Sequence, residues 1–269
     1  MPQESKELRQ AALHWLTEAD PTQKAKGTRQ LAELWVAGNL SLDCTTVLKT
    51  QNTIPGRPQQ PELVAPRLVK RRSLQTLEGR AALIHALAHI EFNALNLALD
   101  AIWRFPDMPP AYYTDWLQVA AEEALHFTLL NQHLHTLGFA YGSFPAHDSL
   151  WEMAAKTSDD VLARMALIPR TMEARGLDVT PGIRAKLAQA GDLPAAEILD
   201  IILRDEIGHV LIGNRWYGWL CEARGVDTIA CYTQMAELYE APTLRGPFNL
   251  QARREAGFSE VEMAALPTH

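Results

Sequence analysis

Two copies of the pattern Glu-x-x-His mark the residues of this sequence that could bind a metal ion. Glu123 is followed by His126, and Glu206 is followed by His209. On an α-helix, positions i and i+3 lie about 60° apart around the axis and one turn apart along it, so a carboxylate and an imidazole reach one point beside the helix. Each copy can therefore supply two ligands to one ion.

Two further glutamates are placed to complete such a site. Di-metal helical bundles take one glutamate from each of two other helices. Glu91 lies 32 residues before Glu123, and Glu173 lies 33 residues before Glu206, so the two halves repeat almost in register. In an antiparallel hairpin that turns near Asp107, Glu91 and Glu123 lie at the same depth, roughly 24 Å from the turn. The predicted ligands are Glu91, Glu123, His126, Glu173, Glu206 and His209.

This ligand set indicates which metals the site would take. Four carboxylates and two imidazoles, without a thiolate, favour iron or manganese over a structural zinc site. A single Glu-x-x-His is more typical of a solvated acid beside a histidine at the edge of the core. The full set at matched spacing favours a metal site, because burying four carboxylates without cations would be very costly.

The elements that must position these residues are helices almost throughout, and we predict an all-α fold. Four prolines in residues 53–66 forbid a continuous helix and indicate a linker on the surface. Gly176 and Pro181 predict the end of the third long helix. We expect an N-terminal helical pair with its linker in residues 1–66, a four-helix core in 67–226 and a C-terminal extension in 227–269. The expected helices are 5–19, 22–37, 74–104, 110–137, 158–175 and 193–224.

Composition and charge exclude several classes of protein. The net charge of −7 argues against a general nucleic-acid binder, whose affinity would come from lysine and arginine. The first ten residues are polar, and no apolar run approaches the roughly 18 to 20 residues that span a bilayer, so we expect neither export nor membrane insertion. Three cysteines without Cys-x-x-Cys spacing suit a reducing compartment. We expect a cytoplasmic protein.

The sequence as a whole resembles a known superfamily and a narrower family. Its Glu, Glu-x-x-His, Glu, Glu-x-x-His order looks like the ferritin-like di-iron carboxylate proteins. The stretches "EGRAALIHALAHIEFNALNLALD", "DWLQVAAEEALHF", "EARGLDVTP" and "DEIGHVLIGNRWY" resemble bacterial domain-of-unknown-function family 455, from about residue 54 onward. The superfamily resemblance implies a ferritin-like four-helix bundle with a buried di-iron centre that reacts with dioxygen. It also implies all six ligands named above, with no departure at any of them.

A second acid precedes the glutamate in each motif. It is Glu122 in the first copy and Asp205 in the second, so the length of the side chain differs between the copies. A residue that binds the metal directly is less suited to such a difference than a residue that contacts only the ligands. Metal-bound histidines usually donate their other N–H to a carboxylate. We predict a crossed pairing, as the resemblance also implies, with Glu122 bonded to His209 and Asp205 to His126.

Two classes of function fit this site. One is a di-iron oxidoreductase, of hydroxylase or oxidase type, that acts on dioxygen and an unidentified organic substrate with an electron-donor protein. A more distant resemblance, to the di-iron hydroxylase of a modified tRNA nucleoside, suggests one substrate class. The alternative is a metal-binding or iron-handling bundle, of ferroxidase type, without an organic substrate. Two manganese ions would instead permit peroxide dismutation. A homodimer is compatible with either class.

Other features have both a functional and a structural interpretation. His85 and His89 lie one helical turn apart, and we interpret them as core or interface histidines rather than ligands. Pro169 predicts a kink or local unwinding near Glu173. The basic residues 66–73 could hold an anion or RNA, but a solvated helix start is the simpler interpretation. The connection 141–152 is too long for a tight turn, and we expect it to form surface hydrogen bonds. The sequence does not decide whether Arg253 or Arg254 faces a substrate.

Overall fold

A computed structural model describes residues 6–267 of the chain. The start of the polar N-terminal segment, residues 1–5, lies outside the described part, as do residues 268 and 269. Within residues 6–267 the protein is helical and contains no β-strand, which confirms the all-α fold class. The chain divides into two compact units, Met1–Asp148 and Ser149–His269. The three-part division expected from the sequence stays a prediction.

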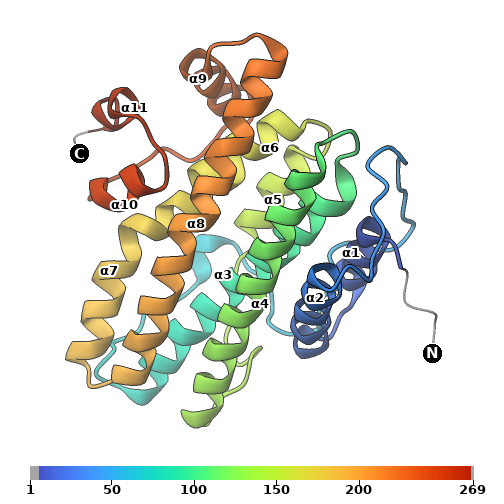
Figure 1. The fold of residues 1–269 in the computed structure, drawn as a ribbon. Coiled ribbons are helices and arrows are strands. Elements are labelled where there is room, and N and C mark those ends of the chain that lie inside the picture. The colour runs from blue at the N-terminus through green and yellow to red at the C-terminus, as the bar shows by residue number, and fades with distance from the viewer. Residues whose placement is uncertain (1–5, 268–269) are drawn as a thin grey trace. The chain divides into compact units, whose positions relative to one another are not determined.

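In its described part, residues 6–148, the first unit contains four α-helices. Asp20 caps α2 by accepting hydrogen bonds from the backbone N–H groups of Thr22 and Gln23, and Thr76 caps α3 by accepting from Gly79. Side chains that accept these first amides define where a helix begins. Figure 1 shows α3 and α4 as two long neighbours in teal and green, with α1 and α2 in blue. The helices are α1 (Leu8–Thr17), α2 (Pro21–Val36), α3 (Leu77–Arg104) and α4 (Pro110–Thr136), with a short 3₁₀ turn, η1 (Pro66–Leu68).

Helices α3 and α4 form the hairpin that the sequence predicts. The chain reverses between Arg104 and Pro110, where Asp107 adopts a left-handed conformation with φ 62°. Tyr113 at the start of α4 donates a hydrogen bond of 2.8 Å to the Phe105 carbonyl, which fixes the turn. Because the turn is centred near Asp107, the middle of each helix lies beside the middle of the other.

Helix α3 is unusually apolar for a helix that carries predicted ligands. By length and average composition it could cross a membrane. The expectation from the sequence concerned uninterrupted apolar runs, whereas α3 reaches a high average around a few polar residues. Of its most apolar window, 78% is buried inside the protein. A buried core helix passes the same test, so the finding is weak evidence for a membrane span.

A buried lysine joins the N-terminal helices to α3 and to the proline-rich segment. The Lys24 ammonium donates to the carbonyls of Leu16 and Gly56 at 3.1 and 2.8 Å, and to Asn96 Oδ1 at 2.5 Å. It also lies 4.9 Å from the centre of the Phe92 ring. Burial lowers its pKa to about 7. Residues 53–65 form no helix, as predicted, and their attachment to Lys24 shows how they are held on the unit.

The second unit is built around the long helix α8. Asp192 caps its start, and Gly225 ends it in the left-handed conformation at φ 63°, where a side chain would be strained. Helices α6 and α7 pack against α8, and the short helices at the C-terminus follow it. The helices are α5 (Ser149–Lys156), α6 (Val161–Leu167), α7 (Ala174–Gln189), α8 (Leu193–Arg224), α9 (Thr228–Leu238), α10 (Leu250–Glu255) and α11 (Glu260–Ala264).

The third predicted helix, 158–175, differs most from the structure. It was expected to end before Gly176 and Pro181, but α7 continues through both residues to Gln189. Pro181 lacks the N–H that would bond to the Leu177 carbonyl four residues earlier. The side chain of Asn249 donates to that carbonyl instead, at 3.2 Å. A residue 72 positions away in the chain therefore compensates for the proline, which local sequence could not indicate.

Pro169 has the local effect that the sequence predicts. Residues Ile168–Glu173 form a π-helical turn, here called the π turn, between α6 and α7. Gly213 of α8 lies directly against it, since a Cβ at this glycine would come within 2.4 Å of the Pro169 ring. The expected unwinding is confirmed, and glycine at position 213 is what lets α8 approach it closely.

Candidate metal centre

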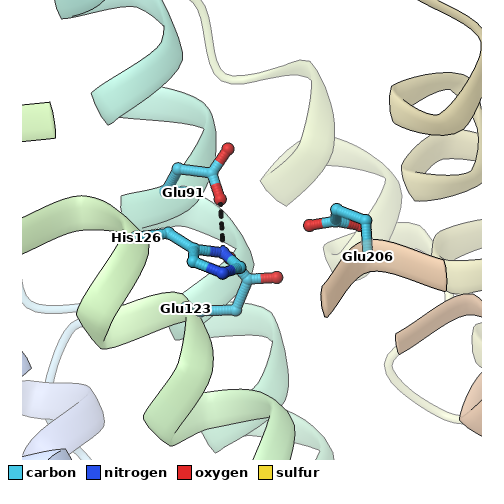
Figure 2. Close-up of side chains that lie close together, drawn as sticks. All are labelled: Glu91, Glu123, His126 and Glu206. Carbon is cyan, nitrogen blue, oxygen red and sulfur yellow. Dashed lines mark hydrogen bonds and ion pairs between the residues drawn. The ribbon is translucent and has the colours of Figure 1, made fainter. Parts of the chain in front are cut away.

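The first unit brings three of the predicted ligands together. Glu91 projects from α3, while Glu123 and His126 project from α4, one helical turn apart. The His126 Nδ1 atom lies 3.2 Å from Glu91 Oε2 and 3.5 Å from Glu123 Oε2. Their ligating atoms all lie within 4.8 Å of one another, and the three residues are 5%, 1% and 0% exposed. Figure 2 draws these side chains with the Glu91–His126 contact dashed; Glu206, also drawn, belongs to the second unit.

The electrostatics of this cluster suit a cation. Burial, together with the nearby charge of Glu123, raises the pKa of Glu91 to about 7, while the hydrogen bond with His126 acts in the opposite direction. Two carboxylates placed together away from water repel each other unless a proton or a metal ion lies between them. The donor set of two carboxylates and one imidazole nitrogen therefore fits a divalent metal ion.

The second unit repeats this geometry on one helix. Glu206 and His209 of α8 are buried, and His209 Nδ1 lies 3.5 Å from Glu206 Oε1. In both copies of the motif, the same imidazole atom thus faces the glutamate at the same distance. Glu173 is the last residue of the π turn, which packs against α8. The grouping of all six residues around shared ions stays a prediction.

The acids that precede the two glutamates have other partners on their own helices. Glu122 accepts a hydrogen bond of 3.1 Å from Gln118, and Asp205 accepts one of 2.8 Å from Arg204. Both acids are half-buried. These contacts leave room for a second partner on each carboxylate, since a carboxylate offers about four acceptor positions. The crossed pairing with the histidines stays a prediction.

Comparison with known proteins places the chain in a family. Residues 17–264 match the family described as "Protein of unknown function (DUF455)". The chain belongs to this family. It is also 52% identical, over 220 residues, to a relative named "Uncharacterized protein" from Haemophilus influenzae (strain ATCC 51907 / DSM 11121 / KW20 / Rd). The aligned region covers 79% of this chain and 76% of the relative. No solved structure matches. The predicted resemblance to family 455 is confirmed, and it brings no named activity.

Two other histidines of this DUF455 protein have structural roles. His85 accepts a hydrogen bond from the Gly142 amide at 2.9 Å. The His89 Nε2 lies 3.1 Å from the His147 carbonyl oxygen, and its Nδ1 lies 2.8 Å from the Tyr141 hydroxyl. Burial lowers the pKa of each imidazole to about 4. The interpretation of His85 and His89 as core histidines is confirmed.

The connection between α4 and α5 is tied to the proline-rich segment. Asp148 pairs with Arg57 at 2.7 Å, and the Ala146 carbonyl accepts from the Val64 amide at 2.8 Å. The connection therefore forms hydrogen bonds at the edge of its unit, as expected. The helix α5 that begins at its end, Ser149–Lys156, was not predicted.

Positively charged residues in this DUF455 protein fall into exposed and buried groups. Arg67, Lys70 and Arg71 of the basic stretch are exposed, and this stretch includes the short turn η1 before α3. Arg253 is 1% exposed and pairs with Asp178 at 2.7 Å, whereas Arg254 is exposed and pairs with Glu260.

Sequence reasoning did not single out Arg170, which lies in the π turn and is 7% exposed. An arginine inside the apolar run that surrounds Pro169 is the signal that could have found it, since arginine is rarely buried without partners.

Proposed function

We propose that this DUF455 protein is a non-haem di-iron protein that activates dioxygen, with manganese as the alternative metal. The proposal includes a ferritin-like four-helix bundle formed by α3, α4, α8 and the helix interrupted by the π turn. The observation that carries it is the repeated motif geometry, in which a buried Glu-x-x-His presents His Nδ1 to the glutamate at 3.5 Å in each unit. Six ligands from four helices would then hold two ions.

Each residue has a role that follows from its chemistry. The imidazoles of His126 and His209 would each bind one ion through Nδ1, which faces the carboxylates. Glu91 and Glu173 would each bring a further carboxylate from a separate helical segment. Buried carboxylates can change between one-oxygen and two-oxygen binding, so they can keep a position open for a small ligand.

A pair of ferrous ions in such a site can supply two electrons to dioxygen. The protein would contribute the ligands, the orientation of each imidazole and the exclusion of water. Glu122 and Asp205 would set the tautomers of the histidines by accepting from Nε2. The organic substrate, an electron-donor protein and a second copy of the chain are the partners that this proposal implies.

Dioxygen consumption by the iron-loaded protein tests the proposal. Protein reconstituted anaerobically with ferrous iron should consume dioxygen faster than the same iron in buffer, with a new absorption band that Glu123→Ala abolishes. Consumption at the rate of buffer iron, unchanged in Glu123→Ala, would show that the site does not activate dioxygen. Rapid disproportionation of peroxide by manganese-loaded protein, without dioxygen uptake by the iron form, would indicate that manganese is the metal that the site uses. Uptake that yields only ferric iron, with no organic product, would favour the iron-handling alternative.

A further inference from the structure

The π turn determines where the Glu173 side chain points. It contains one more residue than an α-helical turn, so side chains beyond it are rotated by about 100° relative to an uninterrupted helix. The Thr171 hydroxyl donates to the Ala166 carbonyl at 2.8 Å, and the Ala174 amide bonds to the Pro169 carbonyl. Because Glu173 is the last residue of this turn, any change in the turn redirects its carboxylate.

One side chain of the π turn, Arg170, is held on several sides. Its guanidinium lies 4.7, 5.3 and 5.0 Å from the ring centres of Tyr217, Tyr232 and Phe258. Its Nη1 donates to Asn214 Oδ1 at 2.8 Å. A guanidinium that stacks on aromatic rings and also makes directed hydrogen bonds has little freedom to move. Arg170 therefore fixes the π turn to helices α8 and α9 and to Phe258 in the C-terminal segment, which here means residues 250–267.

The C-terminal segment supplies the charge that neutralises Arg170. The Glu262 carboxylate forms an ion pair with the Arg170 Nη2, and it also accepts from the Ser259 hydroxyl and amide at 2.7 and 2.8 Å. Asn214, the α8 partner of Arg170, donates to the Ala256 carbonyl at 2.7 Å. Four residues thus hold Arg170, directly or through Asn214 or Glu262, and are here called the C-terminal clamp: Ala256, Phe258, Ser259 and Glu262.

A buried apolar cluster packs against the clamp. Helices α7, α8 and α10 share one buried cluster. This cluster covers the first turns of α7 directly after Glu173. Its buried members are Ala174, Leu177, Val210, Ala252 and Ala256, with Leu203, Ile207 and Phe258 packed around them.

We infer that Arg170 is a positioning residue for the metal site and that the C-terminal clamp sets where the Glu173 carboxylate lies. This inference rests on the proposed function, in which Glu173 is a ligand. The clamp acts on metal binding without touching a metal, because it fixes the turn that carries the ligand. Residues that orient a ligand usually change metal affinity tenfold to a hundredfold when they are replaced.

A purely structural role for the same contacts would have different consequences. If Arg170 and Glu262 only attached the C-terminal segment, their loss would lower stability but leave the affinity and spectrum of the bound metal unchanged. A positioning role changes affinity and spectrum in protein that is still folded. Metal titration at a temperature where every variant is folded, as judged by circular dichroism, separates the two.

Cobalt titration of the full chain tests the inference. We expect Glu262→Gln and Arg170→Lys to weaken the binding of one Co²⁺ ion about tenfold and to alter its visible absorption, which reports ligand geometry. The matched control is Glu260→Gln, whose partner in the same segment is the exposed Arg254, at 2.6 Å. This control should bind like the wild type. The double variant should bind Co²⁺ with the same affinity as the single variant that binds it less tightly, because the two residues act as one unit.

The possible outcomes separate the inference from the proposed function. If the wild type binds no Co²⁺, the proposed metal site is wrong, and the inference falls with it. If the wild type binds two ions and both variants match its affinity and spectrum, the clamp does not position Glu173, although the metal site stands. Equal losses in Glu262→Gln and Glu260→Gln would also overturn the inference. Should Arg170→Lys fail to fold, Glu262→Gln decides alone.

Discussion

The two halves of the predicted metal site share a ligand pattern but differ in how the first glutamate is held. In the first unit, Glu91 comes from the middle of the uninterrupted helix α3 and lies 3.2 Å from His126. In the second unit, Glu173 comes from the end of a π turn whose arginine is held by the C-terminal clamp. The first glutamate of the predicted set is therefore carried by a regular helix in one unit and by an irregular turn with its own support in the other.

The two glutamates also differ in how far they are buried. Glu91 is 5% exposed, whereas Glu173 is half-buried. Irregular π turns are frequent at functional sites, because a small change within one turn moves a side chain substantially. The comparison indicates that the direction of Glu91 depends on its own regular helix, whereas the direction of Glu173 depends on contacts of the π turn with distant residues.

Loss of either motif histidine should have the largest effect. We expect His126→Ala and His209→Ala each to lose roughly one of two bound ions, because each imidazole serves one ion. His126→Ala should lose the more tightly held ion, since ligands that are already fixed bind with a smaller loss of freedom. Metal analysis after desalting measures this. The exposed His135 on α4 provides the control His135→Ala; full metal content in His126→Ala would contradict the assignment.

The buried carboxylates of the first unit should make the metal-free protein sensitive to pH. The pKa of Glu91 is about 7 in the folded protein, against an ordinary value of 4.5, so between these values the folded state holds a proton that the unfolded state has lost. Stability therefore falls as pH rises through this window, by at most about 1.4 kcal/mol per pH unit, or about 3 kcal/mol in all.

Urea denaturation of chelator-treated protein between about pH 5 and pH 7 measures this slope. Glu91→Gln should flatten it, while the exposed Glu78→Gln on the same helix should leave it as it is. Bound metal should remove the loss, because it replaces the proton. An unchanged slope in Glu91→Gln would show that another group is responsible.

The contact between Gly213 and Pro169 tests the support of the second half. Gly213→Ala places a Cβ within 2.4 Å of the proline ring, so the π turn must move. We expect a loss of about 1 to 3 kcal/mol in stability and weaker binding of one ion. On the same helix, Gly218→Ala meets nothing within 4 Å and should be neutral or stabilising by about 0.5 to 1 kcal/mol. Equal behaviour of the two variants would mean that the contact does not constrain the turn.

Replacement of the acids that precede the motif glutamates, Glu122 and Asp205, should have the smallest of the four effects. Glu122→Gln and Asp205→Asn are each expected to weaken metal binding about tenfold, because the imidazole loses the carboxylate that orients it. If the pairing is crossed, Glu122→Gln should affect the ion that His209→Ala also affects. Competition with a coloured chelator gives the affinities. Effects confined to the ion on the same helix would replace the crossed pairing with a local one.

Most of the helices could be predicted because apolar spacing, prolines and capping residues agree locally. The expected helices 110–137 and 193–224 match α4 and α8 within a residue. The end of α7 could not be predicted, because the Leu177 carbonyl is satisfied by Asn249 from a distant part of the chain. Pro169 indicated an irregular turn, but neither its π-helical form nor its close approach to Gly213 could be read from the local sequence.

The candidate site was predictable to a different extent in each half. Glu91, Glu123 and His126 follow from spacing alone, because they lie on two regular helices joined by a short turn. The role inferred for Arg170 depends on Glu262, 92 residues later, and on three aromatic rings. Long-range support of this kind leaves no local pattern in a single sequence.

Metal content after anaerobic reconstitution with ferrous iron tests the central claim most directly. The wild-type chain should retain about two iron ions after desalting, and Glu206→Ala should retain about one or fewer. Fewer than one ion in the wild type, with the same content in Glu206→Ala, would contradict the account.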